Sequence, residues 1–190
     1  MEKYGFFGGS FNPPTYAHLE IAKKSLKEIG LSKVFLVPVG NYYIKPGLKD
    51  EKDRLCMLNL MCEGECNIEV EDIELNLRKK MTAIDAFRKI ENKYKTTENY
   101  FIMGADNFVK IPSWNDSMDL LKKYNLIVFN RESSVLKSEE KNIKILTIEE
   151  YNNCRSGIIR ELARNKEYGK MEVYTKKEVI NYIREKKIYE

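Results

Sequence analysis

The chain has 190 residues, 43% of them apolar, which suits one domain with a hydrophobic core of its own. Its 33 basic and 29 acidic residues leave a formal net charge of +4 without a long basic block, so we expect a small anionic ligand rather than a nucleic-acid polymer. No apolar run approaches membrane-spanning length and no apolar leader follows Met1, which argues against a membrane partner and favours a cytoplasmic protein.

Short apolar runs alternate with amphipathic stretches along most of the chain. The predicted strands are residues 4–7, 34–39, 67–70, 100–103, 126–129 and 143–146. The predicted helices are residues 17–29, 51–62, 82–94, 116–123, 156–165 and 176–186. This alternation predicts an α/β fold, a doubly wound, Rossmann-like parallel sheet with helices on both faces. We expect residues 1–190 to form a single domain, of which residues 156–190 are a small helical C-terminal part.

The four cysteines are Cys56, Cys62, Cys66 and Cys154. Three of them cluster in one helix-to-loop stretch, and no histidine lies near enough in the sequence to complete a zinc set. We therefore expect reduced structural thiols rather than disulfides or metal ligands.

The first predicted strand leads into the only histidine of the chain. Gly8 and Gly9 follow the apolar run, two prolines follow them, and the helical spacing begins near His18. We expect the glycines and prolines to form a tight turn and His18 to lie in the first turn of a helix. Unpaired backbone amides and the positive end of the helix dipole lie at such a position, so this segment predicts a phosphate-binding site. A histidine without this context would be interpreted as a surface or core residue.

Four predicted strands are followed by unusual polar or aromatic residues. The segments are residues 8–18 after the first strand, 41–45 after the second, 104–107 with Trp114 after the fourth, and 130–131 after the fifth. In an open parallel sheet, ligands bind beyond the carboxyl ends of the strands. We therefore predict that these four segments converge on one edge of the sheet and form a binding site.

The segment Thr15-Tyr16-Ala17-His18 resembles the signature of a nucleotidyltransferase superfamily, in which His or Thr, any residue, Gly and His follow a glycine-rich turn. Within it the chain is most similar to the bacterial nicotinate-nucleotide adenylyltransferases, because the likeness runs nearly from end to end. The matching segments, in the family's order, are residues 37–38, 53–58, 83–85, 103–107, Trp114, residues 130–131, 173–174, Val179, residues 182–183 and 188–189. An ordered series of this kind is more specific than one short motif.

The family's second phosphate motif, Ile-Ser-Ser-Thr followed by a spacer, Ile and Arg, falls on residues 154–160. Three of its positions match this chain, namely Ser156, Ile159 and Arg160. At this spacing we expect Ser156 to cap a helix whose free amides face phosphate and Arg160 to add a forked cation from the first turn. The alternative for Arg160 is an ordinary surface residue, and the motif favours the phosphate role.

The chain also departs from the family's pattern. Thr15 replaces a histidine, Ala17 replaces a glycine, Gly157 replaces a threonine, and residues 78–82 replace the family's Gly-Pro-Ser-Tyr segment. Threonine in the first position is familiar from pantetheine-phosphate adenylyltransferase. Two alternatives therefore stay open: another nucleotidyltransferase of that kind, or a nucleotide-binding regulatory module with impaired catalysis.

The resemblance implies an adenylyltransferase of NAD biosynthesis, which joins ATP and nicotinate mononucleotide to give deamido-NAD and pyrophosphate. It implies His18, Thr15 and Arg160 as catalytic residues. The implied ATP-binding residues are Gly8, Gly9, Ser10, Phe11, His18, Gly104, Asp106, Ser156, Ile159 and Arg160. The implied acceptor-binding residues are Lys45, Thr82, Ala83, Trp114 and Arg131.

Two of these residues have alternative interpretations. Asp106 either hydrogen-bonds a ribose or caps a helix, and Trp114 either stacks on the pyridine ring of the acceptor or lies in the core. We expect Mg²⁺ to arrive with ATP, because it prefers phosphate oxygens and water, and we expect no metal site built by the protein alone. The aromatic residues between positions 182 and 189 are compatible with a homodimer.

Overall fold

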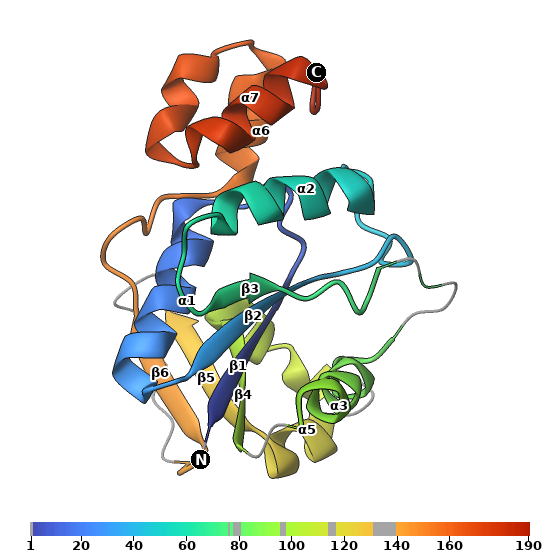
Figure 1. The fold of residues 1–190 in the computed structure, drawn as a ribbon, viewed down its shortest axis with the longest axis vertical. Coiled ribbons are helices and arrows are strands. Elements are labelled where there is room, and N and C mark those ends of the chain that lie inside the picture. Colours follow the sequence, from blue (N-terminus) through green and yellow to red (C-terminus); the bar gives the residue numbers. More distant parts are fainter. Residues whose placement is uncertain (1, 76, 78–80, 96–97, 114–116, 131–139) are drawn as a thin grey trace.

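The computed structural model describes residues 2–75, 77, 81–95, 98–113, 117–130 and 140–190. Six strands in this part of the chain form one sheet in the order β3-β2-β1-β4-β5-β6, and every neighbouring pair is parallel (Figure 1). The strands are β1 (Lys3–Gly9), β2 (Lys33–Pro38), β3 (Ile68–Val70), β4 (Glu98–Gly104), β5 (Asn125–Asn130) and β6 (Ile143–Thr147). The direction of strand addition reverses at β1, so the topological switch point lies between β1 and β4.

Helices follow most of the strands, as the sequence predicts. They are α1 (Tyr16–Ile29), α2 (Glu51–Cys62), α3 (Ala83–Tyr94), α4 (Ala105–Phe108), α5 (Ser117–Lys123), α6 (Ser156–Arg164) and α7 (Lys177–Glu185), with 3₁₀ turns η1 (Ile111–Ser113) and η2 (Tyr168–Val173). The elements α4, η1 and η2 were not predicted, because they are too short for a periodic apolar pattern. The prediction that Gly8 and Gly9 form a turn is wrong: both continue β1 and pair with β2.

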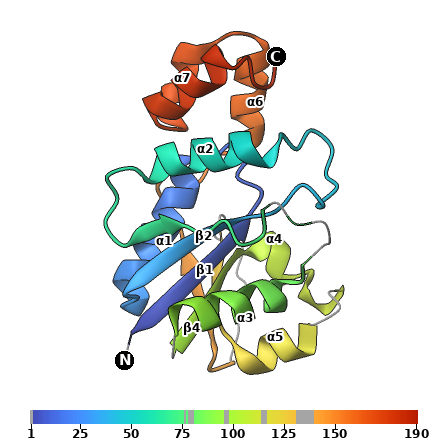
Figure 2. The same ribbon diagram turned by 45° about the vertical axis from the view of Figure 1, so that its right-hand side comes forward.

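The strands bury both of their faces, because successive side chains point to opposite sides of a sheet. Phe6, Phe35 and Phe101 belong to one core, which α3 and α5 cover. Phe7 and Leu36 belong to the other core, which includes buried side chains of α1, α2, α6 and α7. Figure 2 shows α3 on the side of the sheet opposite to α1 and α2. The doubly wound α/β class is therefore confirmed.

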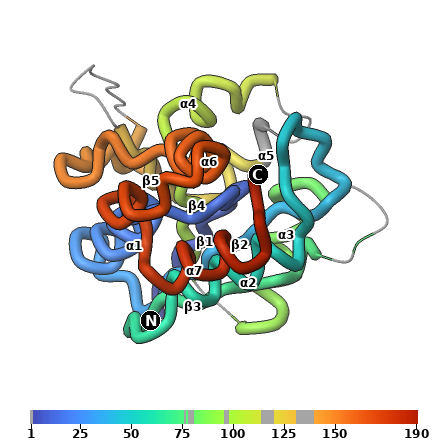
Figure 3. The backbone as a smooth tube through the Cα atoms, turned by 90° about the horizontal axis from the view of Figure 1, so that it is seen from above, coloured from blue at the N-terminus to red at the C-terminus, as the bar shows by residue number. Residues whose placement is uncertain are grey.

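The helices α6 and α7 lie at the end of the molecule toward which β1 runs (Figures 1 and 3). Of the two, α7 is tied to α2: the Tyr182 hydroxyl donates to Asp53 Oδ1 at 3.0 Å, and Lys176 Nζ, at the N-cap of α7, donates to the Glu63 carbonyl at 2.9 Å. Buried apolar residues of α7 join the same core as those of α1 and α2. The helical segment predicted over residues 156–190 thus lies beside the carboxyl ends of the strands.

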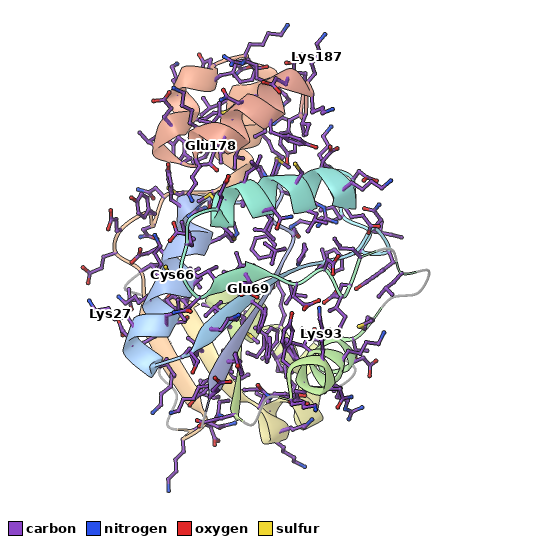
Figure 4. The ribbon with its side chains drawn as sticks, in the orientation of Figure 1. Lys27, Cys66, Glu69, Lys93, Glu178 and Lys187 are labelled. Atoms are coloured by element: carbon purple, nitrogen blue, oxygen red, sulfur yellow. The ribbon has the colours of Figure 1, made fainter. Side chains whose placement is uncertain are left out.

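The surface of the described residues is rich in charged side chains, and Lys27 and Lys187 point away from the molecule (Figure 4). None of the helices described is both long and apolar enough to cross a membrane. None of the four cysteines forms a disulfide, which agrees with the expectation of reduced thiols. Cys62 is buried, and its removal from water raises the pKa of its thiol to about 12, whereas Cys66 is exposed in the turn after α2 (Figure 4).

The difference in exposure between Cys62 and Cys66 predicts a difference in the reactivity of their thiols. The thiolate is the reactive form of cysteine, so we expect iodoacetamide at pH 8 to alkylate Cys66 at least about tenfold faster than Cys62 in the folded protein. Peptide mass spectrometry over a time course measures both rates. Denaturing the protein in urea is the control and should bring the two rates together. Equal rates in the folded protein would contradict the burial of Cys62.

Candidate active site

The carboxyl ends of four strands meet at one edge of the sheet. Gly9 at the end of β1 pairs with Pro38 of β2, and Gly104 at the end of β4 pairs with Phe129 of β5. Because β1 also pairs directly with β4, these two ends flank the switch point. The predicted convergence is confirmed for the residues that the structure describes. Crevices at such a point are where open α/β sheets bind ligands.

The turn that leaves β1 adopts an unusual backbone conformation. Phe11 is buried with a positive φ of 43°, which a bulky residue rarely adopts. A Cβ atom on Gly9 would lie only 3.0 Å from the Phe11 ring, so a larger residue there would require the ring to shift by a few tenths of an ångström. Backbone strain of this kind persists where the surrounding structure enforces it, and such positions cluster at ligand sites.

His18 is the third residue of α1, in the first turn as predicted, and its ring is fixed by its neighbours. The Thr15 backbone N–H donates to His18 Nδ1 at 3.0 Å, and Thr15 Oγ1 lies 2.8 Å from the same nitrogen. The Phe11 ring meets the imidazole edge-on at 5.1 Å between centroids. Because a backbone N–H can only donate, Nδ1 must present its lone pair, and the proton of the neutral ring is on Nε2.

Two departures from the family's signature lie in this segment. Thr15 is completely buried, and its hydroxyl contacts the His18 ring. This contact positions the ring, and the catalytic role of Thr15 stays a prediction. The Ala17 side chain is also completely buried and belongs to the core between the sheet and α1, so its methyl group does not protrude toward the turn.

The first turn of α6 is hydrogen-bonded to the same turn after β1. Arg160 Nη1 donates to the Asn12 carbonyl at 2.8 Å, and Ser156 Oγ donates to the Pro13 carbonyl at 2.7 Å. His18 and Arg160 are therefore linked through residues 12–15, although they are far apart in the sequence. The expectation that Ser156 caps α6 is wrong: Arg155 occupies the N-cap position, and the Ser156 hydroxyl is used by the Pro13 carbonyl instead.

Two residues expected near ATP are buried. Ile159 and Phe11 pack their side chains into the core and are almost completely buried as whole residues. Gly8, Gly9 and Ser10 are half-buried beside them.

Asp106 lies across the switch point, in the first turn of α4. The alternative that Asp106 is the helix N-cap is wrong, because Gly104 occupies that position. Asp106 is exposed, and its carboxylate folds over Gly104, where an added Cβ atom would lie 2.6 Å from Oδ1. A side chain at position 104 would therefore displace this carboxylate.

The residues expected to bind the acceptor are only partly described. Lys45 is exposed in the loop after β2. Thr82 is the N-cap of α3, where its Oγ1 accepts from the Asp85 N–H at 3.2 Å, and Ala83 is the first residue of that helix. Trp114 and Arg131 lie outside the described residues, so both alternatives for Trp114 stay predictions.

Arg54 holds the turn after β1 in place, and it was not predicted as a site residue. Its side chain is completely buried and donates to three backbone carbonyls: Nε to Lys49 at 2.9 Å, Nη1 to Ser10 at 3.0 Å and Nη2 to Val39 at 2.6 Å. One guanidinium thus fixes the turn after β1, the end of β2 and the approach to α2. All three hydrogen bonds are part-buried, so water replaces a lost donor only incompletely.

A signal for Arg54 was present in the sequence. It precedes Met57 and Leu58 by three and four residues, so it lies on the buried face of α2, where a charged residue needs a specific partner. Burial lowers the pKa of Arg54, and the charge of the nearby Glu51 carboxylate opposes that shift.

A second contact that was not predicted joins the loops after β2 and β3. The Tyr42 hydroxyl donates to Glu74 Oε2. Burial raises the pKa of Glu74, and the hydrogen bond from Tyr42 opposes the shift. Gly40 is required beside this pair, because a Cβ atom there would lie 2.4 Å from the Glu74 carbonyl oxygen. This contact fixes the base of the loop that carries Lys45.

A doubly wound parallel sheet with loops gathered at its switch point defines an α/β protein of the class that binds ligands at that edge. The model of the Cytidylyltransferase-like family matches residues 6–162. A protein of Shouchella clausii named "Probable nicotinate-nucleotide adenylyltransferase" is 32% identical over 168 residues, which cover 87% of each chain. A protein of Listeria monocytogenes serotype 4a with the same name is 33% identical over 133 residues, covering 69% of this chain and 71% of its own.

The chain therefore belongs to the cytidylyltransferase-like family and, within it, to the nicotinate-nucleotide adenylyltransferases. The fold agrees with a solved structure of the Plasmodium falciparum nicotinic acid mononucleotide adenylyltransferase complexed with NaAD. The TM-score is 0.82 over 100% of this chain and 98% of that one, at 19% sequence identity.

The Arg54 contacts predict a large effect on stability. Arg54→Ala removes a completely buried side chain and leaves three part-buried carbonyls without this donor, so we expect the free energy of unfolding to fall by about 3 kcal/mol or more. Urea denaturation measures the loss. Arg88→Ala is the control, because Arg88 is exposed and its ion pair with Asp85 is 3.9 Å long, so it should change stability by less than about 0.5 kcal/mol. Equal losses in the two variants would contradict the assigned role.

Proposed function

We propose that the protein transfers the adenylyl group of ATP to nicotinate mononucleotide and releases pyrophosphate, giving deamido-NAD. The observation that carries this proposal is the turn after β1, where the His18 ring and the first turn of α6 meet at the switch point of the sheet. The named relatives support the choice of acceptor. The protein is thus an enzyme of NAD biosynthesis.

The reaction requires no covalent intermediate with the protein. An oxygen of the acceptor's phosphate attacks the α-phosphorus of ATP, and the bond between that phosphorus and the oxygen bridging to the β-phosphate breaks. The acceptor phosphate is already an anion, so no strong base is needed. The protein must instead align two negative groups and stabilise the charge that develops on the α-phosphate and on pyrophosphate.

We assign this stabilisation to residues around the turn. His18 presents its Nε2 proton, because Nδ1 accepts from the Thr15 backbone. Arg160 has five N–H groups, and its bond to the Asn12 carbonyl leaves others to donate to the outgoing pyrophosphate. We propose that Ser156 contributes its backbone N–H at the start of α6, because its hydroxyl already donates to the Pro13 carbonyl. At the start of α1, the Thr15 and Tyr16 N–H groups already donate to His18 Nδ1 and to the Tyr174 carbonyl.

On the acceptor side, the assignments remain those that the resemblance implies. We propose Lys45 and Arg131 for the acceptor phosphate, Thr82 and Ala83 at the start of α3 for its nicotinate end, and Trp114 for stacking on the ring. Asp106 is proposed as a hydrogen-bond partner of an ATP ribose, which its exposed position at the switch point supports.

Nucleotidyltransferases of this family generally use a divalent metal with ATP. We propose Mg²⁺, bound by phosphate oxygens and water. Within the described residues, no group of three or more His, Cys, Asp or Glu side chains is placed to hold a metal ion, and this donor set fits a cation carried by the nucleotide. A homodimer, a cytoplasmic location and the absence of a nucleic-acid partner stay predictions.

The role of His18 is tested by removing its ring. His18→Ala removes the Nε2 donor, and loss of one such preorganised donor typically lowers kcat by about 100- to 1000-fold. We expect that loss in a pyrophosphate-release assay with ATP and nicotinate mononucleotide, with the fold retained by circular dichroism. Activity within a few-fold of the wild type would contradict the assignment.

His18→Gln is the matched control for stability. Gln at the third helical position can accept from the N-cap backbone N–H, as Nδ1 of His18 does. We therefore expect His18→Gln to restore the stability that His18→Ala loses without restoring the activity.

The acceptor is tested with the wild-type protein and a panel of phosphates. Pyrophosphate release should occur with nicotinate mononucleotide and match the deamido-NAD formed; nicotinamide mononucleotide and phosphopantetheine are the comparison acceptors. Release with phosphopantetheine alone would select the other nucleotidyltransferase. ATP binding without release for any acceptor would select the regulatory module.

A further inference from the structure

We propose that Thr175 and Tyr189 are positioning residues, which hold the turn of residues 12–14 against α6 and so keep Arg160 and His18 in place for adenylyl transfer. Neither residue lies in a segment that touches the nucleotide in the proposed function. The proposal rests on that function for its activity readout only.

Three successive carbonyls of the turn are hydrogen-bonded by the segment after residue 155. Arg160 donates to the Asn12 carbonyl and Ser156 to the Pro13 carbonyl, and Thr175 Oγ1 donates to the Pro14 carbonyl at 3.1 Å. Two residues after Pro14, the Tyr16 backbone N–H donates to the Tyr174 carbonyl at 2.9 Å.

This arrangement has an electrostatic consequence for an anion site. A carbonyl oxygen that faced a phosphate would repel it, because both carry negative charge. Hydrogen bonds from Ser156, Arg160 and Thr175 keep these three oxygens directed at the C-terminal helices instead. Of the three donors, Thr175 is the one outside the phosphate motif, and its role is therefore confined to orienting the backbone.

Tyr189 acts on the turn through the Asn12 side chain. Its hydroxyl donates to Asn12 Oδ1 at 2.9 Å, and the Lys49 backbone N–H donates to the same oxygen at 3.2 Å. With Oδ1 so occupied, Asn12 Nδ2 donates to the Gly47 carbonyl at 2.9 Å. Asn12 therefore joins the turn after β1, the loop that carries Lys45 and the last helical part of the chain.

Because these groups are buried, the loss of one of their hydrogen bonds is costly in free energy. Thr175 is 0% exposed, Tyr189 5% and Asn12 6%, so water does not readily replace a lost partner. Burial raises the pKa of Tyr189, which keeps its hydroxyl protonated and able to donate at every working pH. Removing the Thr175 hydroxyl therefore takes its donor from the Pro14 carbonyl, and removing the Tyr189 hydroxyl leaves Asn12 Oδ1 with the longer bond from the Lys49 N–H alone.

The test uses two variants that remove a hydroxyl and little else, Tyr189→Phe and Thr175→Val. Tyr182→Phe is the matched control for the first, because the Tyr182 hydroxyl donates to Asp53 and not to the turn. Ser25→Ala is the control for the second, because its buried hydroxyl donates to the Ile21 carbonyl within α1. All four variants lose one hydrogen bond, and urea denaturation measures what each loss costs in stability.

We expect kcat/KM for ATP to fall about tenfold in Tyr189→Phe and Thr175→Val and less than about twofold in the two controls, even where the stability losses are equal. A fall in activity that merely follows stability across all four variants would overturn the proposal. So would unchanged activity in both test variants. If one test variant fails to fold, the other decides the outcome against its own control.

A double-mutant cycle tests whether Tyr189 acts through Arg160. In an Arg160→Ala background, adding Tyr189→Phe should lower kcat/KM by clearly less than tenfold, because only the part of its effect that acts through His18 is left. A full tenfold loss in that background would contradict the proposed route.

The affinity for a nonhydrolysable ATP analogue, measured by calorimetry, separates this proposal from the proposed function. If the wild type makes no deamido-NAD, the proposed function is wrong. The affinities of the variants for the analogue then still test the positioning proposal. We expect Tyr189→Phe and Thr175→Val to bind the analogue more weakly than their controls do. Equal affinities would overturn the proposal.

Discussion

The turn after β1 is held by donors that lie far from it in the sequence, and the rest of the site depends on this constraint. Arg54 fixes the Ser10 carbonyl from α2, while Arg160, Ser156 and Thr175 fix the next carbonyls from the C-terminal helices. A turn of this composition has few backbone partners of its own, since it contains two prolines. Tertiary hydrogen bonds therefore supply what secondary structure cannot.

The parallel sheet explains why these donors can reach the turn. Because all strands run the same way, the carboxyl ends of β1 and β4 lie beside each other at the switch point. The helices α2, α6 and α7 gather at the end to which β1 runs (Figure 3), so that residues from both halves of the chain surround one short loop. The strained Phe11 backbone and the oriented His18 ring are consequences of this enclosure.

Much of the fold could be predicted from local patterns, because buried strands and amphipathic helices leave periodic signals. The order of α1 to α3 and the edge where the strand ends meet follow from them. The contacts that build the site have no such signal: Tyr189 and Asn12 are 177 residues apart. The same limit explains the error at Ser156, whose local sequence favours a cap, while the nearby Pro13 carbonyl competes for its hydroxyl. Arg54 was accessible in principle, as a charge on a buried helix face.

The most direct measurement is an experimental structure of the protein with a nonhydrolysable ATP analogue. The account predicts that the triphosphate lies over the turn after β1, with His18 Nε2 and an N–H group of Arg160 each within hydrogen-bonding distance of a phosphate oxygen, while Arg160 keeps its bond to the Asn12 carbonyl. A triphosphate bound away from this turn, or in contact with His18 while Arg160 points elsewhere, would contradict it.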